Sequence, residues 1–272
     1  MEKQQIVLVG GGTMGEAIVR GLLREDLVQA DSVTVCDPVA ERRDFLSSEL
    51  GVRVTDDNAD AVPGASIVIL AVKPQVLDDV MAGLNGTVGS ATLIVSIVAG
   101  ATIRAIGMGL GTRAIVRVMP NTPGQIGEGI SVWTATPDVT DEQRKLAGSI
   151  VGALGQQVYV DREGYLDMAT ALSGSGPAYV FLFIEALTDA GVQMGFPRPV
   201  AAKLALQTVK GSAVYAQDSG EHPAVLRNRV TSPGGTTAEA LYAFEQGGLR
   251  ATVTRAVLAA YEKAKSFGDT EN

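Results

Sequence analysis

The sequence contains one cysteine, Cys36, and one histidine, His222, among 272 residues. A single cysteine excludes an internal disulfide and fits a reducing compartment, and no cluster of residues has the spacing of metal ligands. A Ser-His-Asp or Cys-His site would have to use His222, and no nucleophile-elbow motif surrounds Cys36 or any serine. Because His222 precedes Pro223 at an expected helix start, we interpret it as a cap or surface residue rather than a catalyst.

Positive charge is scarce as well. The chain carries 22 Lys and Arg against 30 Asp and Glu, for a net charge of −8. Since nucleic-acid binding needs clustered positive charge, no nucleic-acid partner is expected. The first residues lack the layout of a signal peptide, and the longest apolar stretches, such as 65–72 and 178–184, are too short to span a bilayer. We therefore expect a cytoplasmic protein with no membrane partner.

Short apolar runs alternate with helix-like segments through the first 160 residues. The strand-like runs cover 6–9, 32–36, 67–72, 92–98 and 114–119, and the helix-like segments cover 14–24, 39–50, 74–83 and 101–110. Two further short strands, 129–134 and 157–160, flank a helix that opens at Thr140-Asp141-Glu142. Continuously apolar strands are typical of a parallel sheet covered on both faces. The order predicts an α/β N-terminal Rossmann-type doubly wound domain over residues 1–161.

Strand patterns end near Asp161, and only helical patterns follow. They cover 163–172, 177–194, 199–216, 224–230, 237–245 and 249–267. Pro177, Pro199 and Pro223 sit at expected helix starts, where a missing N–H costs nothing. Residues 178–184 are apolar on every side, so a helix there must be buried all round. Because this segment is too small to bury that helix alone, we predict an all-α C-terminal dimerisation domain over 162–272, covered by a second subunit.

The segment Gly10-Gly11-Gly12-Thr13-Met14-Gly15 fits the G-x-G-x-x-G pattern. It follows the strand expected at 6–9 and opens the next helix, where glycines allow close backbone approach and the helix N-terminus attracts a pyrophosphate. We predict that Gly10, Gly12, Thr13, Met14 and Gly15 bind a dinucleotide. A plain glycine turn is the alternative, and the strand–turn–helix context favours binding.

Asp37 ends the second expected strand, 22 residues after Gly15. An acid at this place usually binds a ribose 2′-hydroxyl, which indicates NAD. Arg42 and Arg43 follow, however, and an arginine could hold the 2′-phosphate of NADP instead. A capping role for Asp37 beside a solvated arginine pair is equally open, so these residues leave the cofactor undecided.

Two more segments follow strands at the same expected edge of the sheet. Ala71-Val72-Lys73-Pro74-Gln75 places Lys73 near phosphate or ribose, although an ordinary exposed lysine is the alternative. Residues 117–124, RVMPNTPG, form a loop fixed by two prolines and a glycine. This loop is expected to wall off a nicotinamide pocket, and a structural crossover loop is the alternative.

Two segments of small residues lie in the second half. Residues 173–177, SGSGP, could admit a ligand close to the backbone or form a tight interdomain turn. Residues 230–237, VTSPGGTT, end at a helix start, where backbone N–H groups and hydroxyls would form an anion site that suits a carboxylate. The charge at a helix terminus contributes only about 0.3–2 kcal/mol, so several hydrogen bonds must act together. A merely capped helix is the alternative.

Together these segments resemble the pyrroline-5-carboxylate reductase family. The match covers nearly the whole chain: Gly10–Gly15, AVKPQ at 71–75, MPNTP at 119–123, LSGSGPAY at 172–179 and VTSPGGTT at 230–237. The resemblance implies reduction of 1-pyrroline-5-carboxylate, a small anionic cyclic imine, to L-proline, the last step of proline biosynthesis. It implies NADP(H) as hydride donor, with NAD(H) as the alternative, and a homodimer with interlocked helices that can gather into a decamer.

The resemblance also implies roles for matching residues. Thr237 would be the catalytic group that hydrogen-bonds the ring nitrogen, and it is too weak an acid to do more than orient the imine and relay a proton. The substrate carboxylate would be bound by Ser232, Gly234, Gly235 and Thr236, with Ser175 nearby. The turn would bind the cofactor together with Asp37, Asn58, Ala71, Lys73, Pro74 and Asn121. One departure is the Cys-Asp-Pro at 36–38, where many members carry an Asn-Arg or Ser-Arg type pair. A strong NADPH preference is therefore not implied.

Two other functions fit parts of the sequence. A related reductase for a β-hydroxyacid or another imine would place a catalytic lysine on a helix of the second domain. Lys203 and Lys210 are available there, but neither lies in a matching motif. A non-catalytic dinucleotide sensor would keep Gly10–Gly15 without needing the 230–237 loop, so the loop favours an enzyme.

Overall fold

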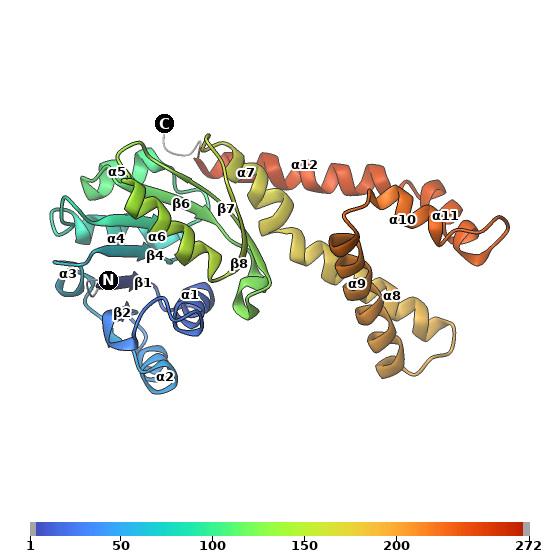
Figure 1. The fold of residues 1–272 in the computed structure, drawn as a ribbon, viewed down its shortest axis with the longest axis horizontal. Helices are drawn as coiled ribbons and strands as arrows, with labels where there is room; N and C mark the ends of the chain where they lie inside the picture. Colours follow the sequence, from blue (N-terminus) through green and yellow to red (C-terminus); the bar gives the residue numbers. More distant parts are fainter. Residues whose placement is uncertain (1–3, 269–272) are drawn as a thin grey trace. The chain divides into compact units, whose positions relative to one another are not determined.

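The computed structural model describes residues 4–268. The described chain forms two compact units (Figure 1). The first comprises the described residues up to Ser175 together with those from Ala260 on, and the second comprises Gly176–Ala259. The change of pattern at 161/162 marks where the strands end. The first compact unit extends beyond this point, to Ser175. The domain boundary at 161/162 therefore stays a prediction.

An eight-stranded sheet forms the centre of the first unit, in the order β3-β2-β1-β4-β5-β6-β7-β8. The strands are β1 (Ile6–Val9), β2 (Val33–Cys36), β3 (Arg53–Thr55), β4 (Ile67–Leu70), β5 (Leu93–Ser96), β6 (Ile115–Met119), β7 (Gly129–Ala135) and β8 (Gly155–Tyr159). The strands from β3 to β6 in this order are parallel. The chain winds outward on one side through β2 and β3 and then on the other through β4, so the topological switch point lies between β1 and β4. The predicted doubly wound fold is confirmed.

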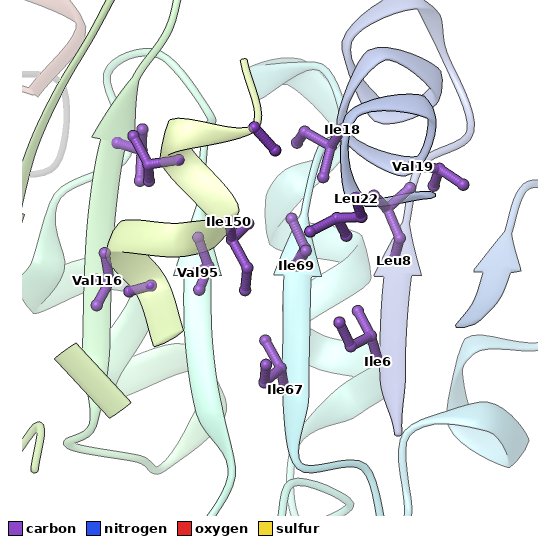
Figure 2. Close-up of a cluster of buried hydrophobic side chains, with 14 of the residues drawn as sticks. Ile6, Leu8, Ile18, Val19, Leu22, Ile67, Ile69, Val95, Val116 and Ile150 are labelled. Carbon is purple, nitrogen blue, oxygen red and sulfur yellow. The ribbon is translucent and has the colours of Figure 1, made fainter. Parts of the chain in front are cut away.

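Helices cover both faces of this sheet. They are α1 (Thr13–Arg24), α2 (Ala40–Leu50), α3 (Asn58–Ala61), α4 (Leu77–Leu84), α5 (Ile103–Leu110) and α6 (Asp141–Gly152). All four residues of β1 are buried, and they alternate between two cores: Ile6 and Leu8 face α1, whereas Val7 and Val9 face α4 and α5. Figure 2 shows the first core, in which Ile6 and Leu8 lie beside β4 and under α1. Burial on both faces explains the continuously apolar strands of the sequence.

Two elements are absent from the sequence expectations, and the direction of one predicted strand is new. The sequence pattern misses β3 and α3, because they are only three and four residues long and mostly half-exposed or exposed. Strand β7 is antiparallel to β6 and parallel to β8. A parallel pair needs a crossover of about a dozen residues or more, whereas the short turn at Thr122–Ile126 is the main element between β6 and β7. The predicted start of α6 is confirmed by a capping box between Thr140 and Gln143.

The rest of the described chain is helical, and no strand follows Tyr159 within residues 4–268. The first unit continues with α7 (Tyr165–Ala169) and a π-helical turn at Thr170–Gly174. Then come α8 (Gly176–Gln193), α9 (Arg198–Ser219), α10 (Pro223–Arg229), α11 (Thr236–Gln246) and α12 (Leu249–Gly268). Helices α8 and α9 pack against each other in the second unit. The three prolines lie in the first turns of α8, α9 and α10, as predicted, and His222 caps α10 by accepting a hydrogen bond from the N–H of Ala224 at 3.2 Å.

Helix α8 exposes large apolar side chains. Phe181 is 63% exposed and Leu182 is 65% exposed. The helical run Tyr165–Gln193 is long and apolar enough to cross a membrane by length and composition alone. The uninterrupted apolar stretch 178–184, which is too short for a span by itself, lies inside this longer helical run, and the helix continues through Glu185. An exposed apolar surface of this kind marks a site of interaction with a partner.

Candidate active site

The residues predicted to bind a dinucleotide lie at one edge of the sheet. The glycine turn follows β1, Asp37 follows β2, and Asn58 begins α3 after β3. Ala71, Lys73 and Pro74 follow β4, and Asn121 follows β6. Because these strands are parallel, their carboxyl ends share an edge, and the turn sits at the switch point where doubly wound folds bind ligands.

Gly10 fits tightly between two strand ends. Its N–H donates to the carbonyl of Cys36 at 2.8 Å, while the N–H of Ala71 donates to the carbonyl of Val9 at 2.8 Å. A Cβ on Gly10 would lie 2.7 Å from the carbonyl oxygen of Ala71, and the φ of Gly10 is +103°. Only glycine meets both conditions, so the turn is held close to β2 and β4.

The start of α1 forms a cradle for a phosphate group. A Cβ on Gly15 would lie 2.2 Å from the carbonyl oxygen of Gly10, so this glycine lets the helix start pack on the turn. Gly12 is the N-cap of α1, with no side-chain cap, and a Cβ there would meet no described heavy atom within 4 Å. The cradle therefore opens to free space at Gly12, where the unpaired N–H groups of the helix favour an anion. These residues fit the pyrophosphate of a dinucleotide.

Asp37 holds the turn by hydrogen bonds to the backbone. Its Oδ2 accepts from the N–H of Gly11 at 2.9 Å, and its Oδ1 accepts from the N–H of Val39 at 2.9 Å. Asp37 is therefore not a helix cap, since the N-cap of α2 is Val39 and has no side-chain cap. It holds the backbone of the turn instead, and its suggested ribose contact stays a prediction. Arg43 extends this anchor, because its Nη1 donates to the Asp37 carbonyl at 2.8 Å and its Nη2 lies 3.2 Å from Asp56 Oδ2.

Arg42 lies across the glycine turn. Its Nε donates to the carbonyl of Gly11, and its Nη2 donates to the carboxylate of Glu16 on α1. Glu16 also accepts from Nε of Arg20 at 2.7 Å. Partial burial acts to raise the pKa of the Glu16 carboxyl, but the hydrogen bonds and charges of Arg42 and Arg20 outweigh it and lower the pKa below the usual 4.5. Sequence reasoning missed Glu16, whose only signal was its place one residue after the glycine pattern.

Asn121 is also engaged with the protein. Its Oδ1 accepts from the N–H of Ile130 at 2.9 Å, and its Nδ2 donates to the carbonyl of Ser173 at 3.2 Å. Ser175 follows the π-helical turn, and its N–H donates to the carbonyl of Thr170 at 2.8 Å. The side chain of Asn121 therefore joins the loop after β6 to the segment before α8, a contact that the sequence pattern did not predict.

A cavity of about 400 Å³ lies beyond the ends of β4 and β5. Its lining includes Pro74, Gln75, Ala99, Gly100 and Phe267, all in the first unit. Phe267 packs closely on this loop, since a Cβ on Gly100 would lie 2.5 Å from the Cβ of Phe267. The loop after β5 carries no recognisable motif, and its run of small residues is the only sequence signal for it.

The predicted carboxylate loop lies within the second unit, between α10 and α11. Gly234 has a φ of +64°, and the N–H of Gly235 donates to the carbonyl of Ser232 at 3.0 Å, which closes a tight turn. A Cβ on Gly235 would lie 2.4 Å from Ser232 Oγ. Glycine thus lets the serine hydroxyl lie beside the N-terminus of α11, where Thr236 and Thr237 are the first two residues. Small hydroxyl residues and a helix start of this geometry can bind a carboxylate.

Two family models match the chain. Residues 163–267 match the model described as pyrroline-5-carboxylate reductase dimerisation. Residues 5–100 match the model described as NADP oxidoreductase coenzyme F420-dependent. The first match includes α8, with its exposed apolar residues, and the 230–237 loop.

Curated relatives match over nearly their full length. The chain is 43% identical to a pyrroline-5-carboxylate reductase of Synechocystis over 97% of this chain and 98% of that protein. It is 39% identical to one of Pseudomonas aeruginosa over 99% of this chain and 98% of that protein. A solved structure of Plasmodium falciparum pyrroline carboxylate reductase with NADP bound matches with a TM-score of 0.89 and 33% identity, covering 98% of this chain and 99% of that one.

Proposed function

Since the chain belongs to the pyrroline-5-carboxylate reductase family, we propose that its glycine turn and its 230–237 loop hold the donor and the acceptor of one reduction. The protein reduces 1-pyrroline-5-carboxylate to L-proline, the last step of proline biosynthesis. The geometry of the loop is the main support for the residue roles, because it combines the hydroxyl residues Ser232, Thr236 and Thr237 with a left-handed glycine and a helix start. A simple dinucleotide sensor would not need these features.

Bound NADPH supplies the hydride that reduces the imine carbon, and NADH is the alternative donor. Gly10, Gly12, Thr13, Met14 and Gly15 would hold the pyrophosphate at the start of α1. Asp37 and Asn58 would line the adenosine half, since they follow β2 and β3. Ala71, Lys73, Pro74 and Asn121 follow β4 and β6, on the side of the nicotinamide. The cavity beyond β4 and β5 would accept the nicotinamide end, because a dinucleotide crosses the switch point from one side to the other.

The loop would bind and orient the substrate. Ser232 Oγ and the N–H groups of Gly234, Gly235 and Thr236 would bind the carboxylate, and Ser175 is a further substrate-binding candidate. Thr237 Oγ1 would hydrogen-bond the ring nitrogen. Holding the two reacting carbons near contact and aligned supplies much of the rate of such a transfer.

The reduction requires little proton transfer from the side chains. Hydride addition moves the π pair of the C=N bond to nitrogen, and a protonated imine already carries the proton that nitrogen needs. A threonine hydroxyl is a weak acid, so Thr237 would orient the nitrogen and relay a proton from water rather than generate one. No strong acid or base is required beside it.

The protein oligomerises through its helical segment. We propose a homodimer with interlocked helices in the cytoplasm, in which α8 is covered by the partner, with a decamer as a larger assembly. The exposure of Phe181 and Leu182 supports this arrangement, because burying a side chain of this size contributes about 1.5–3 kcal/mol of favourable free energy.

A turnover assay tests the function. The purified protein is given 1-pyrroline-5-carboxylate with NADPH and, separately, with NADH, and both cofactor oxidation and proline are measured. We expect equal amounts of oxidised cofactor and proline. Preferential reduction of another cyclic imine or of an oxo acid would support a related reductase. Dinucleotide binding without oxidation in any of these mixtures would revive the sensor.

A further inference from the structure

Glu16 and Arg42 connect the glycine turn to the segment after β2. The guanidinium of Arg42 binds the Gly11 carbonyl and the Glu16 carboxylate, and its Nη2 lies 3.5 Å from the Gly12 carbonyl. The ring of Phe45 lies 5.1 Å from Arg42 Cζ and supports the guanidinium from α2. Arg42 is therefore held beside the place where the adenosine ribose of a dinucleotide lies in this fold.

From this arrangement we propose that Arg42 recognises the 2′-phosphate of NADP(H) and that Glu16 is its built-in competitor. The proposal rests on the dinucleotide site described above and adds the residues that choose between NADPH and NADH. Without a 2′-phosphate, Arg42 stays paired with Glu16. With one, the guanidinium exchanges the carboxylate for the phosphate.

The acid after β2 does not oppose this recognition strongly. In NAD-binding sites such an acid accepts hydrogen bonds from ribose hydroxyls and repels a 2′-phosphate. Here each carboxylate oxygen of Asp37 already accepts a backbone N–H, from Gly11 and from Val39. These bonds fix the orientation of the carboxylate and set backbone N–H dipoles against its charge, so its presence does not by itself make the site NAD-specific.

Arg42 is better suited to this exchange than its neighbour. Arg43 is 19% exposed, and its two Nη atoms are engaged with the Asp37 carbonyl and with Asp56. Moving Arg43 would loosen the anchor of the turn. Arg42, in contrast, has a carboxylate partner on another helix that a dianionic phosphate can replace.

Arg20 reduces the cost of this exchange, because it remains paired with the Glu16 carboxylate. Its Nε lies 2.7 Å from Glu16 Oε1, while Arg42 binds the other carboxylate oxygen. When Arg42 turns to a phosphate, Glu16 keeps one positive partner. The low pKa of Glu16 is consistent with a carboxylate that is charged at neutral pH and competes fully for Arg42.

Two ligand fragments isolate this effect without turnover. Adenosine 2′,5′-bisphosphate carries the 2′-phosphate and 5′-AMP lacks it, so calorimetric titration of the full-length protein with each gives the phosphate-dependent part of the affinity. Arg42→Gln should weaken binding of the bisphosphate about tenfold or more and change 5′-AMP binding less than about twofold. Glu16→Gln should tighten bisphosphate binding several-fold and leave 5′-AMP unchanged.

Three further variants serve as controls. Arg104→Gln removes the same charge from an exposed position on α5 and should change neither affinity. Arg42→Lys keeps the charge but loses the planar donors, so an intermediate loss is expected, and it replaces Arg42→Gln if that variant fails to fold. Arg20→Gln leaves Glu16 with Arg42 alone and should weaken bisphosphate binding modestly.

The outcomes separate this proposal from the reductase function. Equal losses for both fragments in Arg42→Gln would mean that Arg42 only supports the turn or the adenine, and would overturn the proposal. An unchanged bisphosphate affinity in Glu16→Gln would show that Glu16 does not compete with the 2′-phosphate for Arg42. Neither result bears on whether proline is formed, and a protein that makes no proline can still show the predicted difference between fragments.

Discussion

Arg117 in β6 and Glu163 before α7 form an ion pair, with Arg117 Nη1 2.8 Å from Glu163 Oε1. The Arg117 side chain is only 5% exposed, and Asp167 Oδ1 lies 3.6 Å from its Nη2. Glu163 Oε1 also accepts the N–H of Ile103 at 2.7 Å, at the first residue of α5. One carboxylate thus joins a strand, a helix start and the segment that leads to α7.

Replacing Glu163 should destabilise the first unit. Glu163→Ala leaves the buried guanidinium with only the longer contact to Asp167 and removes the acceptor at the start of α5. Breaking a buried pair from one side costs about 3–5 kcal/mol, and partial exposure of Glu163 lowers the expected loss to about 2–4 kcal/mol. Urea unfolding of the purified protein measures this change.

Glu262→Ala is the matched control. Glu262 Oε2 lies 3.2 Å from Nζ of Lys265, and both side chains are exposed. Ion pairs of this kind contribute about 0–1 kcal/mol to stability. A loss at Glu163 no larger than at Glu262 would show that the Arg117 pair contributes little net stability.

The cradle predicts opposite effects of alanine at two glycines. Gly12→Ala places a methyl group in open space at an allowed φ of −65°, so the free energy of unfolding should stay within about 1 kcal/mol of wild type. The same methyl group blocks the backbone approach of a pyrophosphate, so NADPH affinity, measured by fluorescence titration, should fall about tenfold or more.

Gly15→Ala should instead destabilise the fold, because its methyl group would lie 2.2 Å from the Gly10 carbonyl oxygen. Strain of this kind costs typically about 1–3 kcal/mol. Normal NADPH affinity in a folded Gly12→Ala protein would place the pyrophosphate away from this turn.

The sheet was predictable from the sequence because its strands are buried on both faces. Each residue of β1 and β4 meets one of the two cores, so the apolar pattern is continuous and its length is that of a strand. In contrast, β3 carries the exposed Arg53, and nothing in its three residues distinguishes it from a loop. The antiparallel direction of β7 depends on the length of a turn rather than on the residues of the strand.

The cofactor edge was predictable for a topological reason. Once the strands are parallel, every segment that follows one of them lies on the same side, so Asp37 and Lys73 could be assigned to that edge without knowledge of contacts. The pairing of Glu16 with Arg42 could not, since it joins side chains 26 positions apart whose orientation depends on tertiary packing. The same holds for Asn121, whose amide binds the carbonyl of Ser173.

The two proposed hydroxyl roles should separate in kinetics. Thr237→Ala removes the group that orients the ring nitrogen, so kcat should fall about tenfold or more while NADPH affinity stays near normal. Ser232→Ala removes one donor to the carboxylate and should mainly raise the substrate KM. Steady-state rates at varied 1-pyrroline-5-carboxylate measure both.

Thr231→Ala provides the control for these two variants. Thr231 lies just after α10, and its hydroxyl donates to the carbonyl of Arg227 in the last turn of that helix at 2.7 Å, so it supports the helix end rather than the proposed carboxylate contacts. A kcat unchanged in Thr237→Ala would remove this residue from the reaction, and a KM unaltered in Ser232→Ala would assign the carboxylate to other groups.

The exposed face of α8 predicts how the assembly fails. Leu182→Glu introduces a charge on each α8 helix of a dimer, at a side chain that is 65% exposed in the single chain. Losing two buried leucines costs at least about 3 kcal/mol, which weakens dimerisation roughly 100-fold or more. Sedimentation velocity over a range of concentrations should show monomers where the wild type is assembled.

Met108→Glu is the control, because it puts the same charge on α5 at a residue that is 72% exposed, and it should keep the dimer. A wild-type assembly in Leu182→Glu would mean that another surface carries the interface.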